Sequence, residues 1–409
     1  MAGCLIHEVG LQFLLKTDDS VPSRRFSNVN IKECNAKGKS TFSKAYVNYD
    51  SGYGAPLFLF WQDSICRIME TKIIEKSKIL DDNTFEDLIS FLENETNRTH
   101  LLKATTAGSE SEIQSILAHH LFAPLASTSR YLVDETKANS ENCPACKKKI
   151  NFGDTSFGHA EYWHGHSDIL IGKSAVRVEK DLEDADATND GSIGEPSLKY
   201  MRRDNRQRLG SSGDAADSDS DCSSLSVEVK LHLNEQGAHL PKVLSQTITN
   251  AFCEATANPQ LSDLFIPSFF ATPDVVSIHM YNCERDRFYT SENMKIWSGE
   301  SYNIGTIVCI WLALHFERLQ NKVPEEEFTL RNVPKSNFQT IVGDLLPIYE
   351  KNLTKPLNNP KNRNSAKVDF DMKFLLVVSD YSKQMSEKLK KIETLYEKKL
   401  QEWENSHIK

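Results

Sequence analysis

A strictly alternating run at residues 225–231 constrains this chain more than any other segment. The run reads LSVEVKL and follows directly on a long polar stretch. In a β-strand, side chains two positions apart point to the same face of the sheet. Val227 and Val229 are therefore expected to enter a core, while Glu228 and Lys230 lie side by side on the opposite face. The run predicts a strand that holds a carboxylate beside an ammonium group.

The polar stretch before this run, residues 181–224, predicts a disordered insertion. It is rich in Asp, Ser, Gly and Asn, so it cannot bury enough apolar surface to offset the entropy of ordering. Residues 181–222 hold eleven acidic and five basic side chains and so carry −6 of the net charge of −9. The remainder is close to neutral, which leaves a nucleic-acid partner open. A hydrophobic content of 39% excludes a collagenous, fully disordered or multi-span membrane protein.

Regular elements flank the alternating run along the chain. We expect a helix at 109–126, strands at 167–172 and 175–179, a helix at about 241–257 and a strand at 274–282.

The strand at 167–172 carries Asp168, which can supply a second carboxylate next to Glu228. Two carboxylates from adjacent strands make a hard oxygen site suited to Mg²⁺ or Mn²⁺. A neighbouring lysine can activate a water or stabilise a phosphate transition state. These groups suffice for metal-dependent phosphodiester hydrolysis. Other E-x-K triplets, such as residues 135–137, lack this context of strand and helix.

The arrangement resembles the PD-(D/E)XK nuclease superfamily, whose core is a helix, three strands, a helix and a further strand. The resemblance covers about residues 109–285. Asp168 matches the metal-binding aspartate of the family, and Glu228 and Lys230 match its (D/E)XK pair. The resemblance implies that Asp168 and Glu228 bind the metal ion and that Lys230 activates water.

Two further site residues follow from the same resemblance. Gln246 matches the polar residue, often Gln, that many members carry on the helix after the (D/E)XK strand. The first helix of the family often supplies a glutamate to the metal shell, for which Glu112 is the candidate and Glu110 the runner-up.

The resemblance implies an α/β protein with a PD-(D/E)XK-like core (helix, mixed central sheet, helix) at residues 109–298. It further implies a metal-dependent nuclease, a hydrolase of phosphodiester bonds in DNA or RNA that uses Mg²⁺ or Mn²⁺. One alternative is a catalytically inactive module of the same fold that binds nucleic acid or a protein. Another is a zinc-stabilised scaffold without nuclease ancestry.

A second metal site is suggested by cysteine and histidine spacing. Cys143 and Cys146 are followed by His159 and His164 in the pattern C-x2-C-x12-H-x4-H, which fits a Cys₂His₂ zinc site, with His166 as an alternative ligand. Glycines in the intervening segment disfavour the helix of a DNA-reading finger. Zinc would instead fasten the approach to the next strand. The alternative is two reduced, inert cysteines in a loop.

The two ends of the chain are expected to differ in structure. Residues 1–108 predict an α+β accessory region, and residues 299–409 predict a helical region that ends in a long helix at 368–404. Apolar residues in that helix recur at coiled-coil-like spacings. The helix either packs on the core of its own chain or joins a protein partner or a second copy.

The compartment is expected to be intracellular, either cytoplasmic or nuclear. Nine scattered cysteines do not form the pattern of a disulfide framework. The N-terminus lacks a basic segment followed by an apolar core. The longest apolar run, residues 304–314, is too short to span a bilayer and predicts a buried helix rather than a membrane segment.

Overall fold

A computed structural model describes residues 25–56, 59–61, 64, 83–127, 130–138, 140–172, 224–233, 236–330 and 332–353. All of these residues belong to one unit of the chain, and they form a mixed α/β structure as the sequence predicts. The predicted insertion, except Ser224, lies outside the described residues. So do the expected strand at 175–179 and the expected C-terminal helix at 368–404, with any partner contact that this helix makes.

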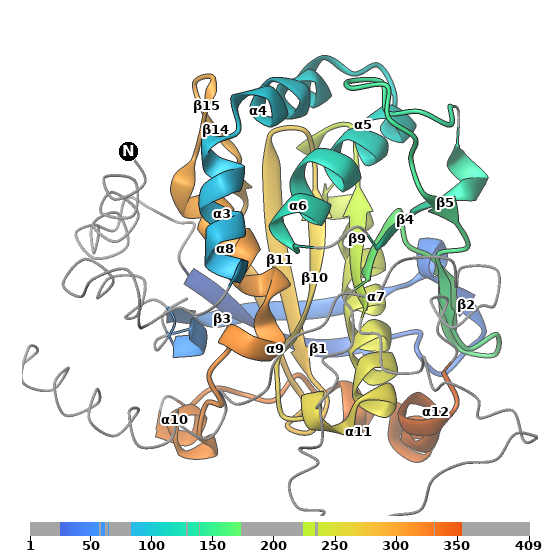
Figure 1. Ribbon diagram of the computed structural model, residues 1–409. Helices are drawn as coiled ribbons and strands as arrows, with labels where there is room; N and C mark the ends of the chain where they lie inside the picture. Colours follow the sequence, from blue (N-terminus) through green and yellow to red (C-terminus); the bar gives the residue numbers. More distant parts are fainter. Residues whose placement is uncertain are drawn as a thin grey trace, which may run out of the picture. The chain divides into compact units, whose positions relative to one another are not determined.

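A large mixed sheet forms the centre of the structure (Figure 1). Its strands lie in the order β3-β1-β12-β11-β10-β9-β8-β4-β5, and β13 pairs with β11. Their bounds are Arg25–Cys34 for β1, Val47–Pro56 for β3, Tyr131–Asp134 for β4, Phe152–Gly153 for β5, Ile169–Gly172 for β8, Ser224–Val229 for β9, Ile266–Ala271 for β10, Val275–Asn282 for β11, Arg287–Ser291 for β12 and Met294–Lys295 for β13. Strands β1 and β3 come from the expected N-terminal accessory region, so the sheet continues across residue 108.

Strands β4, β8, β9 and β10 form the part of the sheet that carries the predicted motif. Strand β8 pairs antiparallel with both β4 and β9, whereas β9 pairs parallel with β10. Helix α5 (Glu110–Leu117) precedes β4 in the chain, and helix α7 (Gln236–Ala257) connects β9 to β10. A parallel pair requires such a crossover connection. The expected pairing of the Asp168 strand with the Glu228 strand is confirmed by the register, in which Ile169 lies opposite Val227.

The two faces of β9 pack against different helices. Val227 pairs with Phe269 of β10, and the Phe269 ring lies 5.3 Å from the ring of Phe122, which belongs to a π-helix that follows α5. On the opposite face, Asn250 of α7 donates a hydrogen bond to the backbone oxygen of Ser224. The polar face of the alternating run is therefore covered by α7 rather than by solvent.

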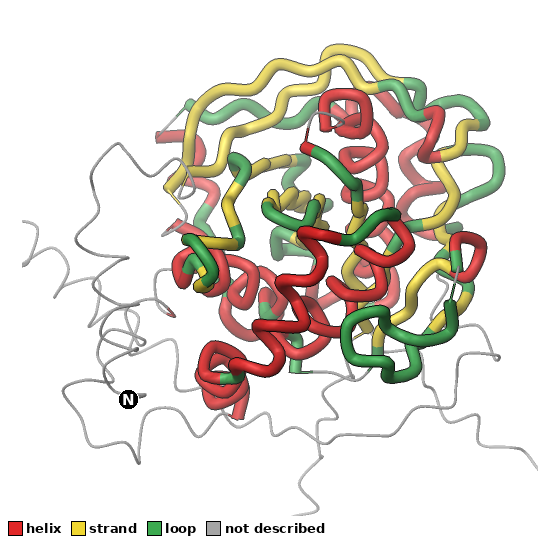
Figure 2. The backbone as a smooth tube through the Cα atoms, turned by 90° about the horizontal axis from the view of Figure 1, so that it is seen from above, coloured by secondary structure: helices red, strands yellow, loops and turns green. Residues whose placement is uncertain are grey.

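Helices lie on both sides of the central strands (Figure 2). The side opposite α7 holds α5, the π-helix at Ala118–Phe122, α6 (Ala123–Leu125), α3 (Asn83–Glu93), α4 (Glu95–Leu102) and α8 (Ile304–Leu314). Shorter helices complete the described part: α9 at Phe316–Leu319, α10 at Glu325–Leu330, α11 at Phe338–Val342 and α12 at Leu346–Lys351. Short 3₁₀ turns occur at Phe42–Lys44, Lys103–Thr106, Glu135–Lys137, Pro259–Leu261 and Gly343–Leu345.

Two small sheets accompany the large one. Strands β2 (Ser40–Thr41), β7 (Trp163–His166) and β6 (Ser156–Gly158) form a three-stranded sheet, and β14 (Trp297–Ser298) pairs with β15 (Ser301–Tyr302).

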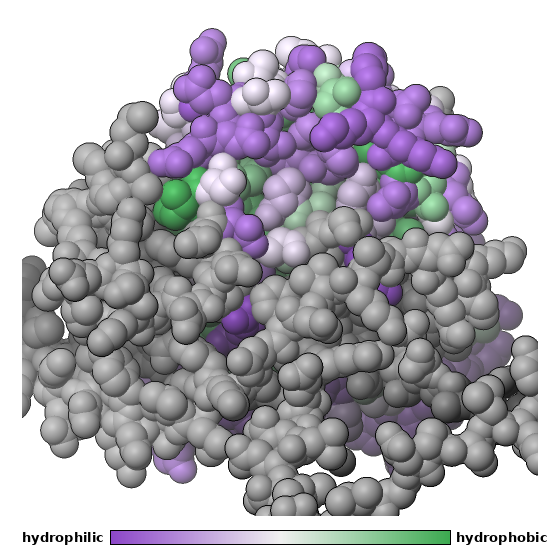
Figure 3. Space-filling model, viewed as in Figure 1, coloured by the Kyte–Doolittle hydropathy of each residue, from purple (hydrophilic) through white to green (hydrophobic). Residues whose placement is uncertain are grey.

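The apolar run at 304–314 forms α8, which is buried from Thr306 to Leu314, so the prediction of a buried helix is confirmed. Figure 3 shows mostly hydrophilic residues over α4 and α5 at the top of the view. Within the described residues, no helix combines the length and the apolar character needed to cross a membrane.

Candidate active site

Asp168 lies immediately before β8, and its side chain is 1% exposed. Its Oδ2 accepts a hydrogen bond from the backbone N–H of Val229 at 2.7 Å, and its Oδ1 lies 2.6 Å from Nζ of Lys137. The bond to Val229 fastens the Asp168 carboxylate to the end of β9. As a result, Oδ2 of Asp168 lies 3.7 Å from Nζ of Lys230.

Glu228 is fully buried, and two lysines contact its carboxylate. Nζ of Lys230 lies 2.9 Å from Oε1, and Nζ of Lys242 lies 2.6 Å from Oε2. Gln246, one turn beyond Lys242 on α7, donates its amide N–H to Oε2 of Glu228 at 3.4 Å and to the backbone oxygen of His166 at 3.1 Å. The structure thus brings Asp168, Glu228, Lys230 and Gln246 into one cluster.

The first helix supplies a different glutamate from the expected one. Oε2 of Glu110 lies 3.3 Å from Nζ of Lys230 and 4.0 Å from Nζ of Lys137. Oε2 of Glu112 instead accepts a hydrogen bond from the backbone N–H of Gly108, while Ser109 caps the N–H of Glu112. These two bonds hold Glu112 at the N-terminus of the helix, beside the N-cap Ser109. Glu110, the runner-up from the sequence, is therefore the glutamate that reaches the cluster.

Burial and charge act in opposite directions on the protonation states of the cluster, and burial raises the pKa of Glu228 despite Lys242 and Lys230. Burial alone would raise the pKa of Asp168, but the charges of Lys242, Lys137 and Lys230 outweigh it and lower that pKa to about 2. Burial alone would lower the pKa of Lys230, but Asp168 and Glu228 outweigh it and raise that pKa. Lys230 therefore stays protonated near neutral pH. A protonated lysine acts on a phosphate group by its charge rather than as a base.

Lys137 and Lys242 were not identified from the sequence. Lys137 ends the 3₁₀ turn at Glu135–Lys137, which begins where Asp134 accepts a hydrogen bond from the N–H of Thr136. Lys137 belongs to an E-x-K triplet that was set aside for lack of strand alternation. Lys242 lies four residues before Gln246, so helical spacing places the two side chains on the same face, and this spacing is the signal for Lys242 in the sequence.

The residues of the cluster fit a divalent ion by their chemistry. Asp168, Glu228 and Glu110 offer carboxylate oxygens, which are the ligands that Mg²⁺ and Mn²⁺ prefer. The oxygens of Asp168 and Glu228 lie 3.7 and 2.9 Å from the same lysine nitrogen. A bound ion would therefore share the oxygens of Asp168 and Glu228 with Lys230. Lys137 and Glu110 are 38% and 34% exposed and form the open side of the cluster.

The expected zinc ligands are not brought together as a set. His164 contacts the backbone oxygen of Tyr162 through Nδ1, and the ring of His159 lies against the ring of Tyr162. His166 lies 3.6 Å from Asp134. Among the described residues, one group of three or more His, Cys, Asp or Glu side chains has ligand atoms that all lie within 4.8 Å of one another, and it consists of His119, His120 and Cys146.

Comparisons of the chain with protein-family models, with curated proteins and with solved structures found no match. The function must therefore be argued from the geometry of the two clusters.

Proposed function

We propose that this protein has a PD-(D/E)XK-like core and is a metal-dependent nuclease. One observation carries the proposal: Asp168, Glu228 and Lys230, chosen from sequence pattern alone, meet in a single buried cluster. The order of elements supports it, because α5, β4, β8, β9, α7 and β10 occur in the order helix, three strands, helix and strand, with the short strands β5, β6 and β7 between β4 and β8. Their sheet order, β4-β8-β9-β10, places the motif at the centre of these strands.

The roles follow from position and charge. Asp168 and Glu228 would hold Mg²⁺ or Mn²⁺, which when bound supplies Lewis-acid stabilisation of phosphoryl oxygens. Lys230, protonated and 4% exposed, stabilises negative charge that develops on the phosphate. Gln246 orients the Glu228 carboxylate through its amide N–H. The half-exposed side formed by Lys137 and Glu110 admits the substrate backbone.

A second candidate function rests on the charge balance of the same cluster. Three lysines already contact the three carboxylates: Lys137, Lys230 and Lys242 against Asp168, Glu228 and Glu110. A cluster whose charges are neutralised internally needs no metal ion. This favours a catalytically inactive module that retains the fold and binds nucleic acid or a protein.

A cleavage assay separates the two functions. End-labelled single- and double-stranded DNA and RNA are incubated with the full chain in Mg²⁺, Mn²⁺ or EDTA. The nuclease proposal predicts cleavage that requires the metal and is lost in Asp168→Asn, which can still accept the N–H of Val229. Asp50→Asn is the matched control, because the Asp50 side chain on β3 is 75% exposed, and this variant should cleave normally. Binding without cleavage under every condition would replace the proposal by the inactive module.

A further inference from the structure

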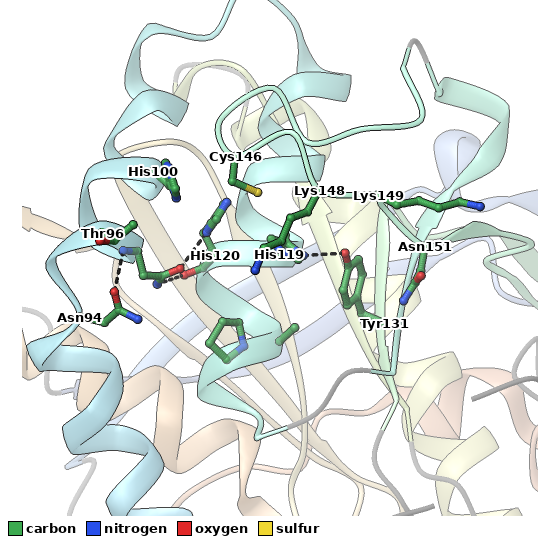
Figure 4. Close-up of a pocket in the computed structure, with 13 residues that line it drawn as sticks. Asn94, Thr96, His100, His119, His120, Tyr131, Cys146, Lys148, Lys149 and Asn151 are labelled. Carbon is green, nitrogen blue, oxygen red and sulfur yellow. Dashed lines mark hydrogen bonds between the residues drawn. The ribbon is translucent and has the colours of Figure 1, made fainter. Parts of the chain in front are cut away.

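A polar cavity of about 750 Å³ lies away from the carboxylate cluster, between α4, the π-helix and the loop that leads to β5 (Figure 4). His119 and His120 face it from the π-helix, and Cys146 faces it from the loop. One ligand atom from each of these three side chains lies within 4.8 Å of the other two. Ligand atoms around a tetrahedral zinc ion lie about 3.5 Å apart, so an inward movement of about 1 Å completes the geometry.

The hydrogen bonds of His120 leave one ring nitrogen for a ligand. The amide nitrogen of Asn97 donates to the backbone oxygen of His120, so its other atom, Oδ1, is an acceptor. Nδ1 of His120 lies 2.7 Å from that oxygen and must carry the proton. Nε2 then holds a lone pair. His120 is only 4% exposed, and its Nε2 is buried without a hydrogen-bond partner. Such an orphaned buried acceptor requires a partner.

His119 is oriented in the same way. Its Nδ1 lies 2.9 Å from the hydroxyl of Tyr131, which leaves Nε2 free of that contact. A neighbour on one ring nitrogen fixes the ring orientation and directs the other nitrogen to a metal ion. Tyr131 and Asn97 therefore act on the two histidines as orienting residues.

Cys143 lies beside Cys146 and outside the group of three, and it is the candidate for a fourth ligand. The backbone N–H groups of Ala145 and Cys146 donate to the sulfur of Cys143, and the two thiols contact each other. Lys147 follows with a positive φ of 64°, and its N–H donates to the backbone oxygen of Cys143, which closes a tight turn around the two sulfurs.

We propose that Cys143, Cys146, His119 and His120 bind a zinc ion. Two cysteines and two histidines offer sulfur and nitrogen ligands and no oxygen, which favours zinc over Mg²⁺ or Ca²⁺. The ion would fasten the loop before β5 to the π-helix and so fix one edge of the sheet. The site is structural, since all four positions of the ion are taken by protein ligands.

Elemental analysis of the full-length protein, purified without chelators and reconstituted with Zn²⁺, tests the site. We expect about one zinc ion per chain, as a closed four-ligand site holds. His120→Gln and Cys146→Ser should each lose most of it. His159→Gln and His164→Gln are the matched controls, because the spacing pattern alone selects those histidines, and they should retain zinc. Loss of zinc in the controls but not in His120→Gln would overturn the proposal.

Because a ligand variant can fail to fold, cobalt substitution on the wild-type chain gives an independent measurement. Co²⁺ in a tetrahedral site with two thiolates gives visible d–d absorption and a sulfur-to-metal charge-transfer band, both removed by added Zn²⁺. We expect both bands. Their absence at excess Co²⁺ would overturn the site. Asp168→Asn should give the same spectrum as the wild type, which keeps this test separate from the nuclease proposal.

Discussion

The residue that governs the candidate active site is a lysine held among carboxylates. Lys230 is 4% exposed and contacts Asp168, Glu228 and Glu110 at 3.7, 2.9 and 3.3 Å. Removing one partner from a buried ion pair leaves an uncompensated charge and costs about 3–5 kcal/mol. Substitutions of Lys230 therefore change stability and chemistry together. Glu110, which is 34% exposed, offers a cleaner test.

Glu110→Gln and Glu112→Gln should differ in activity. Glu110→Gln removes the negative charge that faces Lys230 and Lys137, and we expect the metal-dependent cleavage rate to fall about 10-fold, as for residues that support metal ligands. Glu112→Gln keeps the helix cap, because Gln serves equally at that position. Its cleavage rate should match that of the wild type. Equal rates for the two variants would remove Glu110 from the site.

His279 should make the free energy of unfolding depend on pH. It is completely buried, its Nε2 and Nδ1 face the hydroxyls of Ser277 and Thr290, and burial lowers its pKa to about 3 from 6.5. Between these values the unfolded chain binds a proton that the folded chain does not, so stability is fully present above pH 6.5 and falls as the pH is lowered. The loss from pH 7 to pH 5 is about 2 kcal/mol.

Urea unfolding at the two pH values measures this loss. In His279→Gln the group no longer titrates, so the difference between pH 7 and pH 5 should shrink by about 2 kcal/mol. A difference of the same size in both proteins would show that His279 is not the group responsible.

For single residues, the sequence predicted which side chains share a face where a regular period determines it. Glu228 and Lys230 share a face because strands have a period of two. Both Glu110 and Glu112 lie in the first turn of the helix, and the sequence does not show that Glu112 contacts Gly108 and Ser109 while Glu110 reaches the cluster. Lys137 comes from a 3₁₀ turn, and a turn residue that contacts a partner 31 positions away has no periodic signal.

Among the elements, helix α7 supplies the polar partners that allow β9 to bury the charged group of Glu228. It begins at Gln236, before the expected start at Pro241, and places Lys242 and Gln246 over Glu228. The same helix also buries Leu244 and Ile248 completely in the hydrophobic core. The helix thus combines core packing with two polar contacts to the candidate site.

Leu244→Ala should destabilise the protein by about 2–5 kcal/mol, because it removes buried methyl groups and leaves a cavity. Leu330→Ala makes the same chemical change on α10 at a side chain that is 77% exposed, and its effect should stay within about 0.5 kcal/mol. Chemical denaturation of both variants measures the difference. Similar values for the two would contradict the packing of α7 described here.

The π-helix at Ala118–Phe122 shows why the second metal cluster was not predicted. The sequence predicts a continuous helix at 109–126, which has a period of 3.6 residues. A π-helix adds a residue to the turn and changes which side chains share a face. In the structure both His119 and His120 line the cavity that Cys146 faces. The proposed zinc site keeps the two predicted cysteines, but its histidines precede them in the chain.

For the whole molecule, the acidic segment is inserted at a point where it need not disturb the sheet. Gly172 and Ser224 pair directly in the register of β8 and β9, although 51 residues separate them in the chain. Closing a long loop adds only about 0.6 kcal/mol for each doubling of its length. The sequence predicted this hairpin, but it did not predict that β1 and β3 extend the same sheet, since pairing between distant strands leaves no local signal.

Replacing residues 176–219 by a short Gly-Ser linker should leave the fold intact, with a free energy of unfolding about 1–2 kcal/mol higher. It also removes eleven acidic and seven basic side chains, a net charge of −4, so binding of DNA or RNA should strengthen, most clearly at low salt. Titration of a labelled oligonucleotide at two salt concentrations measures this. Unchanged affinity at both concentrations would show that the segment is only a spacer.

The central claim is that Asp168 and Glu228 bind a divalent metal ion, and a crystal structure of the protein soaked in Mn²⁺ tests it most directly. We predict an anomalous peak within about 2.5 Å of carboxylate oxygens from both residues, with the half-exposed Lys137 turned away from Asp168. At saturating Mn²⁺, the absence of a peak there, with Lys137 still 2.6 Å from Asp168, would contradict the account and leave the cluster as an internally neutralised core.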